Sequence, residues 1–99
     1  MKLNIQFVQT AQRSPAEKLV TDKLEDLAQK FEWIMGADVF FKEEKDTYGK
    51  GKICDIRLSL PGPRIFASSD EESFEASIAE TIRDLEVQLK KRKAEMQSH

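Results

Sequence analysis

The segment CDIRLSLPGPRIFASS, residues 54–69, alternates apolar and polar side chains up to a Pro-Gly-Pro triplet and continues beyond it with the short apolar run Ile65-Phe66-Ala67. Such alternation is typical of strands that bury one face, and Pro and Gly together favour a tight reversal of the chain. The segment therefore predicts two antiparallel strands joined by a turn at residues 61–63. The side chains expected on the buried face of the first strand are Cys54, Ile56, Leu58 and Leu60.

Two earlier segments show the same alternation. Leu3, Ile5 and Phe7 alternate with polar residues within 2–9, and another strand is predicted over 37–44. A long helical segment separates these two strands along the chain. Because a strand that returns through a helix usually pairs parallel to the first, we expect these two to be parallel.

Two amphipathic helices are predicted between and after the strands. The first begins at Ser14-Pro15 and ends near Gly36, and the second begins at a cap formed by Ser69 with Glu72. Apolar residues recur in both at spacings of three and four, which indicates one buried stripe on each helix. The stripes consist of Ala16, Leu19, Val20, Leu24, Leu27, Ala28 and Phe31 in the first helix and of Phe74, Ile78, Ile82, Leu85, Leu89 and Met96 in the second.

The order of elements is therefore strand, helix, three strands, helix. It predicts an α+β fold, β-α-β-β-β-α, in which a four-stranded sheet carries two helices packed on one face. The chain has 99 residues, a length that suits a single domain over residues 1–99. Trp33 is expected to close the core between the first helix and the sheet.

Composition excludes several classes of protein. Apolar residues make up 39% and charged residues 34% of the chain, and the N-terminal segment lacks the continuous apolar run of a signal peptide or membrane helix. We therefore expect a cytoplasmic protein with no membrane partner. The single cysteine, Cys54, has no partner for an internal disulfide, and the single histidine, His99, does not complete a metal site with it. No metal or other cofactor is expected.

The sequence contains no recognisable catalytic group. Nucleophilic catalysis needs a base beside the nucleophile, and the only histidine stands at the C-terminal residue. Cys54 falls on the inward face of a strand, where a thiol packs as a small apolar group. We expect neither an enzyme nor a small-molecule substrate.

Basic residues gather near the end of the second helix, in the run QLKKRKAEM at 88–96. Five basic residues against two acidic ones give positions 83–93 a local charge of +3, although the whole chain has a net charge of -2. Two interpretations are open: a clamp for phosphate groups, or the cations that commonly occupy helix C-termini. A weaker basic group lies around the predicted loop between the second and third strands and comprises Lys42, Lys45, Lys50 and Lys52, with Tyr48 among them.

Two aromatic side chains are predicted on the other side of the sheet. Phe40 and Phe66 alternate with the buried residues of their strands and therefore face away from the helices. If no other element covers that side, the two rings form an exposed aromatic contact surface.

Several motifs in order resemble one known family. They are Lys2-Leu3-Asn4-Ile5, Val20-Thr21-Asp22-Lys23-Leu24, Lys30-Phe31, Ala37-Asp38-Val39, Ile56-Arg57-Leu58-Ser59-Leu60-Pro61-Gly62, Phe66-Ala67, Ser73-Phe74-Glu75-Ala76 and Leu85-Glu86-Val87-Gln88-Leu89 with Lys91 and Lys93. Together they span nearly the whole chain. This arrangement is similar to that of the short ribosome hibernation promoting factors, also called ribosome-associated inhibitor A or sigma-54 modulation proteins.

The resemblance implies a fold like that of double-stranded-RNA-binding domains and a role in silencing translation. Members of the family bind the small ribosomal subunit in the channel shared by mRNA and tRNA, and contact rRNA through basic helix faces. The residues that would contact rRNA here are Lys23, Lys30, Arg83, Lys90, Lys91, Arg92 and Lys93, with Lys42, Lys50 and Lys52 as secondary contacts. The C-terminal dimerisation domain of the long form is not expected, so the chain would not dimerise ribosomes by that route. We expect it to be a monomer.

Four positions depart from the family pattern and remove basic charge. The basic row of the first helix is kept at Lys23 but becomes Asp26 and Gln29, and the second helix has Asp84 and Val87 where relatives carry cations. We therefore expect weaker, less salt-dependent RNA binding than in a more basic relative. The alternative is a diverged protein-binding module that uses the open sheet face and has lost RNA binding.

Overall fold

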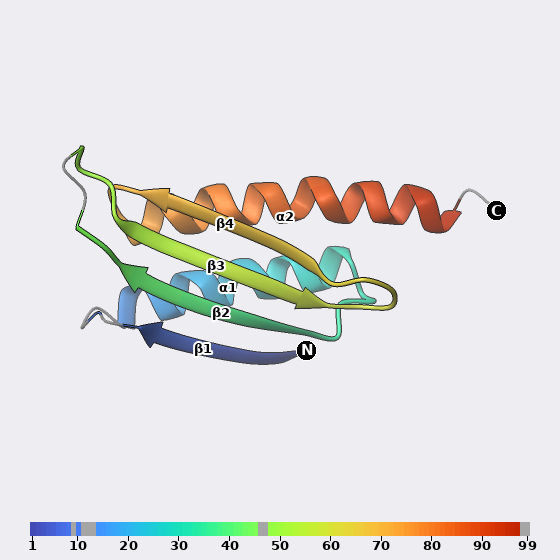
Figure 1. Cartoon of the computed structure of the whole chain (residues 1–99). Helices are drawn as coiled ribbons and strands as arrows, with labels where there is room; N and C mark the ends of the chain where they lie inside the picture. Colours follow the sequence, from blue (N-terminus) through green and yellow to red (C-terminus); the bar gives the residue numbers. More distant parts are fainter. Residues whose placement is uncertain (9, 11–13, 46–47, 98–99) are drawn as a thin grey trace.

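The computed structural model describes residues 1–8, 10, 14–45 and 48–97, without the side chain of Ser14 (Figure 1). The elements in chain order are β1 (Lys2–Val8), α1 (Ser14–Lys30), β2 (Gly36–Glu43), β3 (Lys52–Ser59), β4 (Ile65–Glu71) and α2 (Phe74–Gln97). This is the predicted order, and the α+β class is confirmed.

The four strands form one sheet in the order β1-β2-β3-β4. β1 and β2 are parallel, whereas β2 with β3 and β3 with β4 are antiparallel, as the sequence predicted. The register aligns apolar residues across the sheet: Ile5 pairs with Val39, Val39 with Ile56, and Ile56 with Ala67. Each strand therefore contributes to one continuous apolar inner face.

Both helices cover that inner face and lie side by side (Figure 1). Val20 and Leu24 of α1 and Ile78 and Leu85 of α2 are completely buried in the same core as the inner side chains of the strands. The opposite face of the sheet carries neither helix. Trp33 is half-buried, and its ring packs edge-on against Phe31 at a centroid distance of 5.8 Å, so its predicted place at the core is confirmed.

Two buried polar residues attach α2 to the centre of the sheet. The Ser77 hydroxyl donates a hydrogen bond to the Lys52 carbonyl oxygen. The Thr81 hydroxyl donates to the Ser77 carbonyl oxygen at 2.7 Å and lies 3.2 Å from that of Cys54. Among the described residues, no buried side-chain polar atom is left without a hydrogen-bond partner. These contacts fix the position of α2 along β3.

The turn between β3 and β4 is held by α2. Gly62 has a φ of 91°, a left-handed conformation that favours glycine. The Arg92 guanidinium donates hydrogen bonds to the carbonyl oxygens of Pro61, at 3.2 Å, and Pro63, at 2.9 Å. A Cβ at Gly62 would lie 3.2 Å from Nη1 of Arg92, so the close approach of the helix also restricts this position.

The predicted end of the first helix near Gly36 was wrong, because α1 ends at Lys30. The chain then turns, with the Ile34 amide donating to the Phe31 carbonyl oxygen at 3.1 Å. Gly36 pairs with Lys2 at the start of the sheet, and a Cβ at Gly36 would lie only 2.9 Å from the Lys2 carbonyl oxygen. The residues after Lys30 are therefore needed to bring the chain from the helix layer back to the sheet.

The predicted cap of the second helix at Ser69 was also wrong. Ser69 belongs to β4 and pairs with Cys54, while the Ser73 hydroxyl accepts a hydrogen bond of 3.1 Å from the Ala76 amide. β4 extends to Glu71 because Asp70 is still paired with β3 and accepts a 2.7 Å hydrogen bond from the Gly51 amide. The helix therefore starts only after the strand has ended.

Leu85→Ala should strongly destabilise the protein. The Leu85 side chain is completely buried between α2 and the sheet, and truncation of such a residue leaves a cavity. We expect the free energy of unfolding in urea to fall by about 2–5 kcal/mol. Val87→Ala, on the exposed face of the same helix, is the control and should change it by less than about 0.5 kcal/mol. Equal losses in both variants would contradict the described packing of α2.

Candidate nucleic-acid interface

The predicted rRNA contacts lie on the two helices, away from the sheet. α1 carries Lys23 and Lys30, and α2 carries the remaining residues of this group. Arg83, Lys90, Lys91 and Lys93 are exposed, as are the two lysines of α1. Both helices lie on the same face of the sheet, so the helix layer carries all of these cations (Figure 1).

Glu86 joins the basic groups of the two helices. Its Oε2 atom lies 3.6 Å from Nζ of Lys30 on α1 and 3.4 Å from Nζ of Lys90 on α2. A hydrogen bond from Lys90 is the main cause that lowers the pKa of Glu86. Burial is the second-largest effect and opposes the shift, while the charges of both lysines and a hydrogen bond from Lys30 lower the pKa further. The carboxylate therefore stays ionised at neutral pH. Because its folded pKa is lowered, the bridge stabilises the fold at neutral pH and is lost as the pH falls through that pKa.

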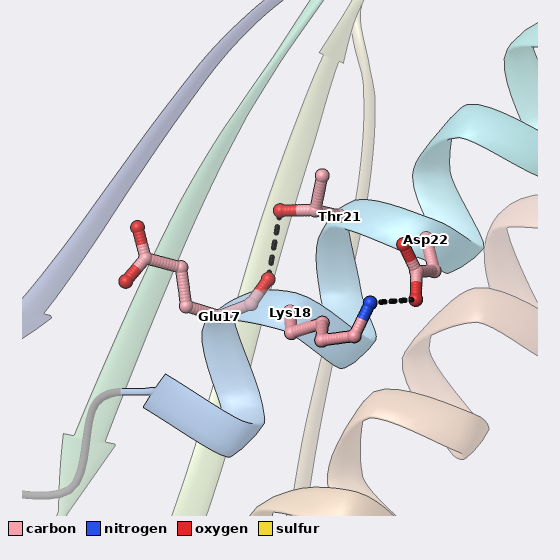
Figure 2. A network of polar contacts seen from close by, with 4 residues as sticks. All are labelled: Glu17, Lys18, Thr21 and Asp22. Carbon is pink, nitrogen blue, oxygen red and sulfur yellow. Dashed lines mark hydrogen bonds and ion pairs between the residues drawn. The ribbon is translucent and has the colours of Figure 1, made fainter.

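Other cations on the helices have local acidic partners. Arg83 pairs with Glu80 within α2. Figure 2 shows the corresponding network on the first turns of α1, where Lys18 pairs with Asp22 at 3.4 Å and the Thr21 hydroxyl donates to the Glu17 carbonyl oxygen at 2.7 Å. These pairs are exposed and contribute little to stability. They nevertheless place a negative charge beside Lys18 and Arg83.

Three of the lysines predicted to contact rRNA form no ion pair with an acidic residue in the described part of the chain. Within the described ranges, Lys23, Lys91 and Lys93 take part in none of the ion pairs. Lys93 and Lys30 line a surface hollow of about 380 Å³ between the C-terminal ends of α1 and α2. The structure therefore brings together Lys30, Lys90 and Lys93 near one end of the molecule, with Lys91 beside them in sequence.

Arg92 has a different environment from its neighbours. Its guanidinium donates to the two carbonyl oxygens of the turn between β3 and β4, and the residue is only partly exposed. The sequence run Lys90-Lys91-Arg92-Lys93 gave no indication of this, because the turn is about thirty residues away along the chain. We therefore assign Arg92 a structural role and leave it out of the contact set proposed below.

The secondary basic group does not converge on one site. Lys42 pairs with Asp55 at 3.0 Å on the helix-free face, and Lys52 pairs with Glu43. Lys50 is exposed in the loop that follows β2. Since strand alternation places Lys42 and Lys52 on opposite faces of the sheet, these lysines offer no common surface to one phosphate backbone.

Cys54 is completely buried, as its place in the sequence predicted. Burial raises the pKa of its thiol to about 12; a hydrogen bond with Thr81 opposes the shift and the charge of Asp55 adds to it. Among the described residues, no group of three or more His, Cys, Asp and Glu side chains is placed to hold a metal ion. His99 lies outside the described residues. No helix in the described part of the chain has the length and apolar character needed to span a membrane.

Comparison with known proteins shows the family. The family model described as sigma 54 modulation protein / S30EA ribosomal protein matches residues 3–97. The chain belongs to this family. A ribosomal subunit interface protein from Coxiella burnetii has a similar structure, with a TM-score of 0.78 and 27% sequence identity over 95% of this chain and 99% of that one. The N-terminal domain of Thermus thermophilus Protein Y, at 20% identity, shares the fold with a TM-score of 0.73 over 92% of this chain and 98% of that one. None of the curated proteins matches the sequence.

Membership of the S30EA family makes this a ribosome-associated protein. The four positions at which the resemblance led us to expect a loss of basic charge lie on the exposed faces of the helices. Asp26 and Gln29 are exposed on α1, and Asp84 and Val87 on α2. Each side chain is therefore accessible to a partner but adds no positive charge there. That this weakens RNA binding remains a prediction.

The sequence did not reveal the role of Glu86. Glu86 and Lys30 are far apart in the chain, and nothing in the pattern of either helix indicates that they meet. The acidic residue was visible only as one of two charges that offset the basic run. A prediction of the relative rotation of the two helices would have been required to find this bridge.

Cys54 should resist thiol reagents in the folded protein. Both its burial and its raised pKa disfavour the reactive thiolate. We expect dithionitrobenzoate at pH 8 to label less than one tenth of the protein under conditions in which the urea-unfolded chain reacts completely. Complete labelling of the native protein on the same timescale would contradict the described position of β3 beneath α2.

Proposed function

We propose that this S30EA-family protein is a translation inhibitor that binds the small ribosomal subunit. In this proposal it occupies the channel shared by mRNA and tRNA, contacts rRNA phosphates through Lys23, Lys30, Lys90, Lys91 and Lys93, and silences translation in the cytoplasm. It acts as a monomer and without a cofactor. Arg83 contributes where a phosphate displaces its partner Glu80.

The convergence of Lys30 and Lys90 carries the proposal. Two ammonium groups from different helices lie within 3.6 Å of one carboxylate oxygen, so the fold already holds an anionic group between them. A phosphate oxygen carries negative charge as a carboxylate oxygen does, and it accepts the same charge-assisted hydrogen bonds from lysine. Lys91 and Lys93 are also exposed, and they extend the basic surface towards the end of α2.

Recognition by this surface would depend on backbone shape and charge. A-form RNA exposes its phosphates and a shallow minor groove, whereas side chains do not reach the base edges of its deep groove. Lysine supplies a flexible point charge, which suits phosphate contacts that position a protein without reading sequence. The net charge of -2 does not oppose this, because residues 70–80 hold five acids and no base, at the other end of α2 from the proposed contacts.

The competing interpretation was a protein-binding module built on Phe40 and Phe66. The two rings stand on strands that are not neighbours, because β3 lies between β2 and β4. Phe40 pairs with Asp55 and Phe66 with Arg57, and Phe40 is only partly exposed. One isolated ring provides less apolar contact area than the core of a stable protein interface requires. The RNA proposal is therefore favoured.

Charge reversal at two of the lysines should remove binding to the small subunit. In co-sedimentation with purified subunits at low salt, we expect Lys90→Glu with Lys91→Glu to weaken binding by more than tenfold. The matched control is Lys18→Glu with Lys45→Glu, which makes the same change in net charge outside the proposed surface and should retain most of the binding. Wild-type binding by the Lys90/Lys91 variant would overturn the proposed contacts.

Glu86→Gln should strengthen binding. Glutamine keeps the size of the side chain but removes the negative charge that occupies Lys30 and Lys90. We expect an affinity for the small subunit that is about three- to tenfold higher at low salt, with a steeper dependence on salt because two more cations are available. Asp22→Asn, which releases only Lys18, is the control and should have little effect. Weaker binding by Glu86→Gln would show that Glu86 positions the lysines and does not compete with RNA.

A further inference from the structure

The helix-free face of the sheet carries a small cluster of exposed residues at the end nearest the turn between β3 and β4. Phe66 on β4 pairs across the sheet with Arg57 on β3, and both are exposed, Phe66 to 50%. Arg64, two residues before Phe66, is also exposed. We refer to Arg57, Arg64 and Phe66 as the sheet-face cluster. Arg57 and Phe66 face away from the helices, because they alternate with the buried residues Ile56, Leu58, Ile65 and Ala67. Arg64 lies directly before the start of β4.

The two arginines of the cluster are not neutralised. Across residues 1–8, 10, 14–45 and 48–97, neither Arg57 nor Arg64 takes part in an ion pair. Two acids lie near Arg57 on this face: Asp38 is its direct partner in the register of β2 with β3, and Asp55 is two residues before it on β3. Asp38 accepts a 3.1 Å hydrogen bond from Asn4, and Asp55 is paired with Lys42 and Ser68. With two arginines against the one carboxylate directly opposite Arg57, the cluster keeps a positive balance around one aromatic ring.

The backbone that carries the cluster is held in place by α2. The Gln88 side-chain amide donates a 2.9 Å hydrogen bond to the Phe66 carbonyl oxygen, on the outer edge of the sheet. Arg92 fixes the turn that precedes Arg64. A ring and two guanidinium groups presented on a fixed backbone lose less conformational freedom on binding than the same groups on a loose loop.

The chemistry of the cluster fits an unpaired nucleotide. An exposed aromatic ring stacks on any base that is free of a helix, and arginine binds phosphate through paired hydrogen bonds. A hollow of about 140 Å³ lined by Lys2, Asn4, Gly36, Asp38 and Ser59 lies on the same face, across Arg57 from Phe66. It offers polar groups to the nucleotide next to the stacked one.

We propose that the sheet-face cluster binds single-stranded RNA, with one base stacked on Phe66 and the adjacent phosphates on Arg57 and Arg64. A protein partner fits less well, because a protein interface requires several apolar anchors and this face presents one ring between two charges. The site is separate from the helix lysines and does not depend on their proposed contacts with rRNA. The protein would then bind RNA on both sides of its sheet.

The test is fluorescence anisotropy with a labelled twelve-residue oligouridine, which has no stable base pairing, at low salt. We expect the wild-type protein to bind, Phe66→Leu to weaken binding by about tenfold, and Arg57→Gln with Arg64→Gln to weaken it and make it less dependent on salt. Phe40→Leu is the matched control on the same face and should change little. Circular dichroism melts of each variant would show that the fold is retained.

A comparison with the helix lysines separates this site from the proposed function. The Lys90→Glu, Lys91→Glu variant should bind the oligonucleotide within about threefold of wild type, even if it no longer binds small subunits. The proposal is overturned if wild type does not bind oligouridine, or if the helix variant loses binding while Phe66→Leu keeps it. If Phe66→Leu lost ribosome binding but bound the oligonucleotide as well as wild type, the sheet-face cluster would contact a ribosomal protein. That result would also overturn the proposal of single-stranded RNA binding.

Discussion

The inner face of the sheet is apolar on all four strands, and this one-sided burial determines the rest of the molecule. Val39, Ile56 and Leu58 are completely buried, so both helices must cover the same face. Two helices on one face lie side by side, and their polar sides then form one surface. Lys30, Lys90 and Lys93 come together on this surface, although they belong to segments more than fifty residues apart.

The same constraint leaves the other face of the sheet without a helix. Its side chains are mostly polar and satisfy one another in pairs such as Lys42 with Asp55. Lys2, Arg57 and Arg64 are charged and exposed, and among the described residues they take part in no ion pair. A protein with a net negative charge can therefore present two separate positive surfaces, because its acids are concentrated elsewhere or already paired.

The fold was predictable from sequence because each element has a clear periodicity. Alternation identified the strands, spacings of three and four identified the helices, and their order limited the sheet to one reasonable topology. The two errors concern boundaries. The end of α1 depends on the return of the chain to Lys2 at the start of the sheet, and the start of α2 depends on how far β4 pairs with β3. Neither is a local property of the residues that were misassigned.

The site was predictable only as a set of basic residues. Sequence indicated which lysines and arginines are exposed, but it gave no information about their acidic partners from distant segments. Glu86 bridges two helices, and Arg92 binds the turn between β3 and β4, so one apparent run of cations contains residues with different roles. These differences arise from the rotation of α2 against α1 and β4, which no single segment encodes.

The central claim is that the lysines of the helix surface contact the small ribosomal subunit. Its most direct test is acetylation of lysine side chains by a water-soluble reagent, followed by mass spectrometry, with the protein free and bound to purified small subunits. The account predicts that binding protects Lys23, Lys30, Lys90, Lys91 and Lys93, while Lys18 and Lys45 remain as reactive as in the free protein. Protection confined to the latter two, or no protection of the helix surface in a sample shown to be bound, would contradict it.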